Sequence, residues 1–390
     1  MTKFSDISEV QKIAQLAMLE LKEDEAEALQ KKFSSIRSYF DSLADIPVSD
    51  NEDISPIGEY KPLREDIPCK SGIRPDSFSA MTDNSSFTVP KFNPVPADRW
   101  VMTVGNFDGL HRGHLHLIDQ MKQYAVQTNS GTVLLSFTPH PKEILNPHTP
   151  LPKIYSLQQK IDLCREAGID RLTLVEFTEK FAQITPEDFI AQYIVGDKIL
   201  VKLYIGFDFN FGKNRSGTAE TVRAALAAKG IPTEQVSAYK IDRMTVSSSM
   251  IRRLLFEGEF EQSALYLGRD WLIEGVVVGG RRQGRQLGFP TANLIPDIYL
   301  PLRAGVYATR IHLEDRKLPA VTNIGVRPTL TDDPQTVIES HIFNFSEDIY
   351  GKKISVQPVR FIRPEQKFSG VEELKSQIAL DLRTAQSRLI

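Results

Sequence analysis

"GNFDGLHRGH", residues 105–114, sets two histidines three positions apart among three glycines. The stretch follows an apolar run and precedes a helical pattern, so we expect a turn between a buried strand and a helix. Backbone N–H groups at a helix start have no partner inside the helix and, together with the helix dipole, favour phosphate. We expect Gly105 and Gly113 to let the backbone approach a nucleotide closely, and His111 and His114 to donate hydrogen bonds to one phosphate as it gains charge. Two ordinary surface histidines are the alternative interpretation.

Residues 97–268 alternate short apolar runs with helical patterns. Unalternated runs of this length are typical of parallel strands buried on both faces; they read "WVMTVGNF", "TVLLSF", "RLTLVEF" and "VKLYIGF". Between them, "SLQQKIDLCREAG" and "TAETVRAALAAKG" have the pattern of helices that end at glycine. The alternation predicts an α/β doubly wound sheet whose ligands bind at the carboxyl ends of the strands.

A different pattern occupies residues 269–390. The runs "WLIEGVVVGG", "GVYATRIHL", "LPAVTNIG", "VIESHIFNF" and "ISVQPVRFI" are broken by turn residues. Such runs predict a small antiparallel β-barrel. A helical pattern from about Gly370 predicts one C-terminal helix after the barrel.

Composition limits the possible classes of protein. The chain has 390 residues and a formal net charge of −3, which argues against direct binding of nucleic acid or an anionic membrane. Cys69 and Cys164 are its two cysteines, too few for a disulfide framework or a Cys-rich zinc site. The N-terminus is polar and no stretch reaches the length of a membrane span. We therefore expect a cytoplasmic protein.

The first 96 residues differ from the rest. Residues 1–46 show two amphipathic helical patterns, the second with an apolar stripe from Leu29 to Leu43. Two short helices bury little against each other, so the stripe is expected to pack on a partner or on the rest of the chain. Residues 47–96 are rich in proline, which excludes helix, weakens strand pairing and predicts an extended strap or linker.

The histidine motif carries a family resemblance. HxGH after a first strand resembles the nucleotidyltransferase superfamily, which includes adenylyltransferases and class I aminoacyl-tRNA synthetases. Further segments, "SFTPHP" (136–141), "GFDFNFGKNRSG" (206–217) and "VSSSMIR" (246–252), resemble bacterial bifunctional riboflavin kinase/FMN adenylyltransferases, also called FAD synthetases. No KMSKS-like loop is found in the sequence, which weakens the synthetase alternative.

This resemblance implies roles in adenylyl transfer from ATP to FMN, which gives FAD and pyrophosphate. His111 and His114 would stabilise the transition state, and Arg252 would meet the phosphates. His140, in the "TPHP" segment, is a candidate flavin contact, with a histidine held in a proline turn as the alternative. The remaining expected contacts to ATP or its phosphates are Gly105, Asp108, Gly113, Asp208 and Ser248.

The barrel region resembles the riboflavin kinase module of the same family. The matching segments are "GRQLGFPTAN" (284–293), "TNIGVRPT" (322–329), "ESH" (339–341), "DIYG" (348–351) and "RFIRPEQKF" (360–368). By resemblance, Thr291 and Asn293 would hold Mg²⁺ and the ATP phosphates, Gly284 would lie at the phosphates, and Glu339 would be the general base. Arg363 is expected to contact the flavin.

Residues 4–92 resemble a second family. "VQKIAQLAMLEL", "PLREDIP" and "FTVPKF" are similar to the C subunit of glutamyl/aspartyl-tRNA amidotransferase. That resemblance implies an adaptor that binds the amidase and tRNA-binding subunits and carries no catalytic residue. Residues 1–96 would then be a scaffold fused to a flavin-nucleotide enzyme. The alternative hypothesis is a structural amidotransferase subunit whose flavin modules have degenerated.

Overall fold

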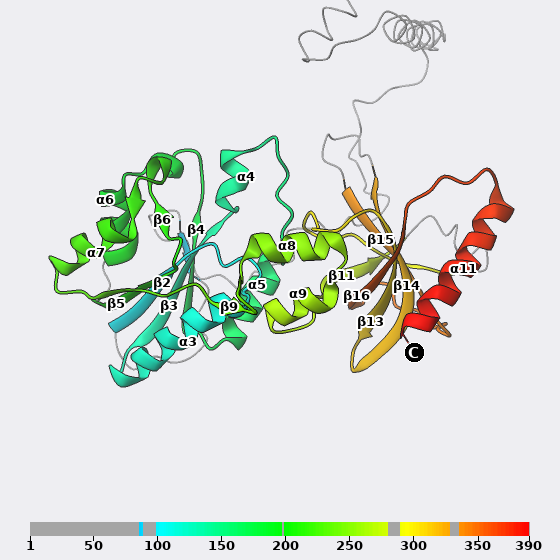
Figure 1. Cartoon of the computed structure of the whole chain (residues 1–390), viewed down its shortest axis with the longest axis horizontal. Coiled ribbons are helices and arrows are strands. Elements are labelled where there is room, and N and C mark those ends of the chain that lie inside the picture. The colour runs from blue at the N-terminus through cyan, green and yellow to red at the C-terminus, as the bar shows by residue number, and fades with distance from the viewer. Residues whose placement is uncertain (1–85, 89–98, 197–198, 280–288, 328–334, 390) are drawn as a thin grey trace, which may run out of the picture. The chain divides into compact units, whose positions relative to one another are not determined.

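The computed structural model describes residues 86–88, 99–196, 199–279, 289–327 and 335–389 (Figure 1). The helical pair expected over residues 1–46 and most of the predicted strap lie outside these ranges. No helix in the described ranges combines the length and the apolar character needed to cross a membrane.

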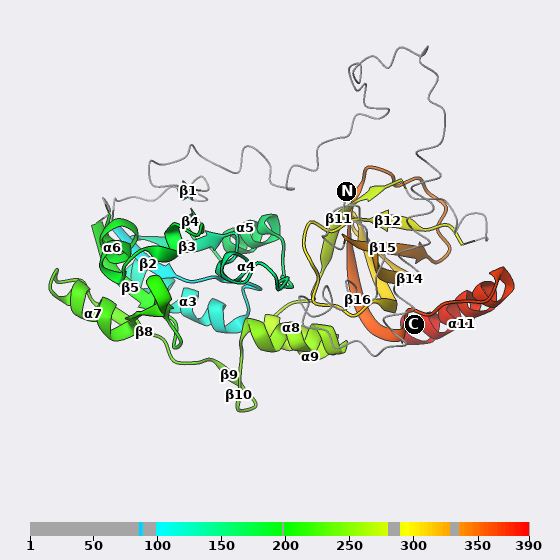
Figure 2. The ribbon, with the colours of Figure 1, turned by 90° about the horizontal axis from the view of Figure 1, so that it is seen from above.

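A largely parallel sheet forms the centre of the first domain (Figures 1 and 2). Its described strands lie in the order β1-β4-β3-β2-β5-β8, and all neighbouring pairs except β1–β4 are parallel. Their bounds are β1 (Ser86–Thr88), β2 (Arg99–Val104), β3 (Gly131–Thr138), β4 (Arg171–Glu176), β5 (Ile199–Ile205) and β8 (Thr233–Gln235). The four apolar runs predicted as parallel strands are therefore confirmed as β2, β3, β4 and β5.

Part of the segment predicted as an extended strap or linker forms a strand. Residues 86–88 form the edge strand β1 and pair antiparallel with β4. Proline is tolerated beside an edge strand, because its missing N–H is not needed on the open side of the sheet. The sheet of the first domain therefore begins inside the segment predicted as linker.

Helices cover both faces of this sheet, as a doubly wound fold requires. On one face, α3 (Arg112–Gln127) and α5 (Leu157–Glu166) pack Ile118 and Ile161 against the apolar side chains of the strands. On the other, α6 (Pro186–Phe189), the π-helix Ile190–Val195 and α7 (Ala219–Ala227) bury Phe189 and Val222.

Short elements and a helix pair complete the first domain. The described short elements are α4 (Pro141–Leu145), 3-10 turns at Phe181–Gln183 and Lys213–Arg215, β6 (Asn210–Phe211) with β7 (Gly217–Thr218), and β9 (Lys240–Ile241) with β10 (Met244–Thr245). Helices α8 (Ser248–Glu257) and α9 (Phe260–Leu267) end the domain, each at a left-handed glycine.

The second domain is a closed antiparallel barrel, as the sequence predicts. Six described strands follow one another around it in the order β11-β12-β15-β14-β13-β16. Their bounds are β11 (Ile273–Val278), β12 (Ala292–Leu294), β13 (Gly305–Leu313), β14 (Arg316–Arg327), β15 (Gln335–Ile342) and β16 (Lys353–Pro364). Helix α11 (Val371–Leu389) follows and packs Ala385 against Val306 and Ala308 of the barrel.

Candidate functional sites in the two domains

The loop after β2 has an unusual backbone. Phe107, Gly109 and Leu110 all have φ in the left-handed region, at +48°, +84° and +37°. A Cβ on Gly109 would also lie 2.8 Å from Cδ1 of Ile154, so glycine is required there. At the start of the loop, the N–H of Gly105 donates to the carbonyl oxygen of Leu135 at 3.1 Å. The loop is thereby fixed at the carboxyl edge of the sheet, where ligands of such folds bind.

The two histidines of the motif meet at the start of α3. His111 is the N-cap, and its Nδ1 accepts a hydrogen bond from the backbone N–H of His114 at 3.3 Å. The rings stack with 3.6 Å between centroids and 14° between planes. Because Nδ1 of His111 is an acceptor, the proton of its neutral ring lies on Nε2. Nδ1 of His114 is buried and has no hydrogen-bond partner among the described residues.

Burial keeps both imidazoles neutral. It lowers the pKa of His111 to about 4, with the cations Arg269 and Arg252 adding to the effect against a backbone hydrogen bond that raises it. Burial also lowers the pKa of His114 well below its usual value, and the neighbouring His111 acts in the same direction. Neutral imidazoles can each donate one hydrogen bond to an incoming oxygen, so this pair suits the recognition of a phosphate at neutral pH.

Gly113 explains the spacing of the motif. A Cβ at this position would lie 3.2 Å from Cε1 and Nδ1 of His111 and 3.5 Å from the carbonyl oxygen of Val246. Glycine therefore leaves room for the His111 ring to fold back over the first helical turn and stack on His114.

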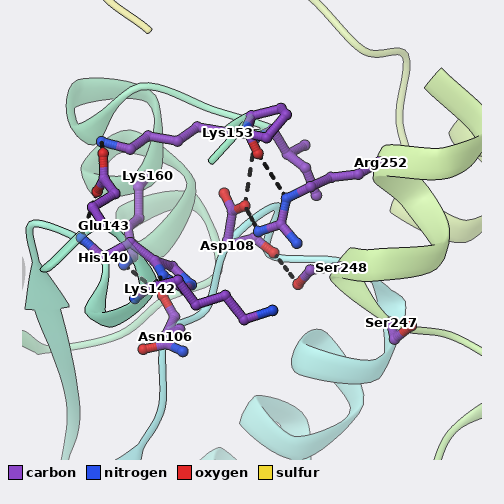
Figure 3. Close-up of polar contacts among 12 residues, drawn as sticks. Asn106, Asp108, His140, Lys142, Glu143, Lys153, Lys160, Ser247, Ser248 and Arg252 are labelled. Atoms are coloured by element: carbon purple, nitrogen blue, oxygen red, sulfur yellow. Dashed lines mark hydrogen bonds and ion pairs between the residues drawn. The ribbon is translucent and has the colours of Figure 1, made fainter. Parts of the chain in front are cut away.

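Arg252 and Asp108 join the loop to α8 (Figure 3). A carboxylate oxygen of Asp108 accepts from Nη2 of Arg252 at 2.5 Å, and both side chains are largely buried. Nε of Arg252 donates to the carbonyl oxygen of Pro152 at 2.7 Å, and Oγ of Ser248 donates to the carbonyl oxygen of Asp108 at 2.8 Å. The structure thus brings together three residues expected at the nucleotide, although Asp108 lies about 140 positions before the other two.

His140 has a clear local role. It is the N-cap of α4: its Nδ1 accepts from the N–H of Lys142 at 3.1 Å, and its own N–H donates to Glu143 at 2.7 Å. Burial, followed by the charge of Arg252, lowers its pKa to about 3. This geometry matches the proline-turn alternative and leaves the flavin contact as a prediction.

Asp208 lies in an exposed turn after β5. Its carbonyl oxygen accepts from Nδ2 of Asn210 at 2.8 Å, a contact within the same turn. Its contact with the nucleotide stays a prediction.

Two cations at this site were not predicted from the sequence. Nζ of Lys160, on α5, donates to the carbonyl oxygen of Asn106 and to Oγ of Ser136, both at 2.6 Å. Arg269 donates to the carbonyl oxygens of Gly109 and Leu110 at 2.5 and 3.1 Å. Neither residue belongs to a local sequence motif, so the sequence alone did not indicate a role for them at this site.

In the barrel, strand pairing gathers the expected kinase residues. Glu339 on β15 is the cross-strand partner of Asn293 on β12 and of Asn323 on β14. Directly opposed residues of antiparallel strands point to the same face and lie about 5 Å apart at Cβ. Nδ2 of Asn293 donates to the carbonyl oxygen of Thr291 at 3.3 Å, so the amide oxygen of Asn293 points away from that carbonyl. A carboxylate therefore lies between two amides; Asn323 was not expected at this site.

The other two expected residues of the barrel have different outcomes. Gly284 lies outside the described residues. Arg363 is bound to helix α11, because its Nε and Nη2 donate to the carboxylate of Asp381 at 2.9 and 2.7 Å. Asp381 is 4% exposed, so this is a buried bidentate ion pair. The predicted flavin contact of Arg363 is not among these interactions.

The fold and these sites define a class of protein: a nucleotidyltransferase-type α/β domain followed by a small kinase-type barrel. Comparison with known proteins agrees. The sequence model of FAD synthetase matches residues 94–250, and that of riboflavin kinase matches residues 267–389. The bifunctional riboflavin kinase/FMN adenylyltransferase of Bacillus subtilis (strain 168) is 36% identical over 73% of this chain and 91% of its own length.

Other relatives extend the same result. The enzyme of the same name from Escherichia coli (strain K12) is 32% identical over 76% of this chain and 95% of its own length. A solved Streptococcus pneumoniae structure, described as a macrolide-efflux protein, is 27% identical, with a TM-score of 0.64 over 76% of this chain and 97% of that one. The chain belongs to the family of bifunctional riboflavin kinase/FMN adenylyltransferases, and it carries both enzyme domains.

Proposed function

We propose that His111 and His114 stabilise the charge that develops on the α-phosphate of ATP when an FMN phosphate oxygen attacks it. A bond forms between that oxygen and the α-phosphorus, and the bond to pyrophosphate breaks. FMN is already an anionic nucleophile, so positioning and charge stabilisation supply the catalysis and no strong base is needed. The observation that carries the proposal is the stacked, neutral imidazole pair at the N-terminus of α3.

The residues around the pair would complete this site. Arg252 would bind phosphate oxygens, with Asp108 holding its guanidinium in place. The remaining assignments follow the sequence: Gly105, Gly113, Asp208 and Ser248 toward ATP, and His140 toward the flavin.

In the barrel, we propose that Glu339 accepts the proton of the ribityl 5′-hydroxyl of riboflavin as that oxygen attacks the γ-phosphate of ATP. The products are FMN and ADP. An alcohol is a weak nucleophile, so this step needs a base where the adenylyl transfer does not. Thr291 and Asn293 would bind the phosphates, Gly284 would approach them through its backbone, and Arg363 would be the flavin contact.

The residues of the barrel site fit Mg²⁺. Mg²⁺ prefers oxygen ligands and usually keeps several waters and substrate phosphate oxygens in its coordination shell. Thr291 offers a hydroxyl and Asn293 an amide oxygen, and the phosphates of ATP would supply further oxygens, which leaves Glu339 to act as the base. The described residues contain no group of three or more His, Cys, Asp or Glu side chains that could hold a metal. When bound, Mg²⁺ would neutralise phosphate charge.

Two substitutions test these roles in the full chain. Glu339→Gln is expected to abolish FMN formation from riboflavin and ATP while FAD still forms from supplied FMN. His114→Ala is expected to do the reverse. Both products are separated by chromatography, and the unaffected reaction in each variant is the control for folding. Loss of both activities in either variant, or of neither, would contradict the assignment.

We also propose that residues 1–96 bind the amidase and tRNA-binding subunits of a tRNA amidotransferase in the cytoplasm. The support is the resemblance of three segments in residues 4–92 and the apolar stripe that needs a partner. Co-purification of the full chain, and of a variant lacking residues 1–85, with these subunits tests the adaptor role. Equal recovery with both chains would reject it. If the full chain itself had neither flavin activity, the alternative of a purely structural amidotransferase subunit would be favoured.

A further inference from the structure

Lys160 occupies a position that the proposed mechanism does not use. Its ammonium lies at the carboxyl edge of the sheet, between the carbonyl oxygen of Asn106 after β2 and Oγ of Ser136 on β3. Oγ of Ser136 also donates to the same Asn106 carbonyl at 3.1 Å. Lys160, on α5, thus contacts the start of the loop after β2, although it lies 54 positions further along the chain.

The charges around Lys160 do not balance (Figure 3). Four cations act on His140 from nearby, namely Arg252, Lys160, Lys142 and Lys153. Two carboxylates face them: Asp108 pairs with Arg252, and Glu143 pairs with Lys153 at 2.8 Å. Lys160 and Lys142 make no ion pair with the described residues.

An uncompensated ammonium of this kind favours an anionic ligand. Removing a charge from water costs free energy unless another charge compensates it, and here Lys160 binds only neutral oxygens among the described residues. Burial lowers the pKa of Lys160 to about 8, although the neighbouring Cys164 and Asp108 act in the opposite direction. A phosphate placed beside the loop would supply the missing negative charge.

We propose that the ammonium of Lys160 binds phosphate oxygens in the adenylyl transfer site. This inference rests on the proposed function of the first domain and adds a residue to it. The phosphate belongs either to the triphosphate of ATP, which leaves as pyrophosphate, or to FMN. Lys160 is then a direct ligand of the substrate and does more than tie two loops together.

The test is the rate of FAD formation from supplied FMN and ATP by the full chain. Lys160→Met is expected to lower kcat/KM for one substrate by about 10- to 100-fold, the range for a lost charge-assisted hydrogen bond. A rise in KM for ATP together with weaker inhibition by pyrophosphate identifies the triphosphate. A rise in KM for FMN alone identifies the FMN phosphate.

Three further variants separate charge from structure. Lys160→Gln keeps hydrogen-bond donors but no charge, and should lose activity like Lys160→Met. Ser136→Ala removes one hydrogen-bond acceptor of Lys160, and its rate of FAD formation should stay within about threefold of that of the wild type. Lys122→Met is the matched control, because Nζ of Lys122 also donates to a backbone carbonyl, that of Ala167, at 2.8 Å; its activity should be unchanged.

The proposal is overturned if Lys160→Gln restores the activity lost in Lys160→Met, or if Ser136→Ala reproduces that loss. It is also overturned if Lys160→Met stays within threefold of wild type. An absence of FAD formation by the wild-type chain would instead reject the proposed function. The riboflavin kinase rate of each variant, carried by the other domain, reports on the integrity of the protein.

Discussion

Replacing Gly113 by alanine should separate the stability of the first domain from its activity. The added Cβ would lie 3.2 Å from two atoms of the His111 ring, closer than about nine in ten Cβ contacts in proteins, so the ring would have to move by a few tenths of an ångström. The ring cannot move freely, because it stacks on His114 at 3.6 Å and caps α3 through Nδ1. The substitution therefore displaces the pair that we assign to transition-state stabilisation.

The magnitudes differ for the two properties. A misplacement of about 1 Å can cost about 100-fold in rate, so a shift of a few tenths should lower FAD formation by about 5- to 10-fold. Alanine is favoured over glycine in a helix by up to about 1 kcal/mol, which offsets the steric cost at this second helical position. We expect the free energy of unfolding of the domain to change by less than about 1 kcal/mol.

The assay compares the initial rate of FAD formation with thermal unfolding of the same protein. Gly370→Ala is the matched control, because a Cβ there meets nothing within 4 Å and the residue lies in the other domain. Riboflavin phosphorylation should be unchanged in both variants. An unchanged rate of FAD formation in Gly113→Ala would refute the reasoning, as would a loss fully explained by unfolding.

Three further predictions concern charge and capping. The pKa of His111 is lowered from 6.5 to about 4, so the unfolded chain binds a proton at a higher pH than the folded chain does. The folded state therefore loses up to about 3 kcal/mol of stability as the pH falls from about 6.5 to about 4. His111→Asn should flatten the pH dependence of the melting temperature. His140→Ala removes the N-cap of α4 and should cost about 1 kcal/mol, seen as a lower melting temperature, with KM for FMN rising only if the ring also contacts the flavin. Arg363→Met leaves Asp381 buried without its partner and should destabilise the barrel domain by about 3 kcal/mol, whereas adding Asp381→Leu should recover part of that loss in urea unfolding.

Much of the fold could be predicted because parallel strands buried on both faces have a distinctive sequence. Val101 to Val104, interrupted only by the buried Thr103, and Val133 to Leu135 are apolar runs, since neither face of the sheet meets water. Strand β12 was missed because it has three residues, one of them Asn293, and is too short to show an alternating pattern. Strand β1 was missed because the surrounding prolines dominate the local signal.

The site was predictable only where its residues are close in sequence. His111, Gly113 and His114 form one turn, so their chemistry and spacing can be read together. Lys160 and Arg269 reach the same loop from 54 and 160 positions away, and no local pattern marks them. Their placement depends on how α5 and the segment after α9 pack, which is a tertiary property.

The two domains differ in charge in the way their proposed reactions require. In the first, burial holds two imidazoles neutral and cations outnumber carboxylates around the loop, which suits an attacking phosphate that already carries negative charge. In the barrel, the carboxylate of Glu339 faces two amides across neighbouring strands, and a hydroxyl nucleophile needs such a group to take its proton. Exchanging these arrangements would remove the base where one is needed and add repulsion where phosphate must bind. The charges at each site therefore support this assignment of the two proposed reactions: phosphorylation of riboflavin in the barrel and adenylylation of FMN at the histidine pair.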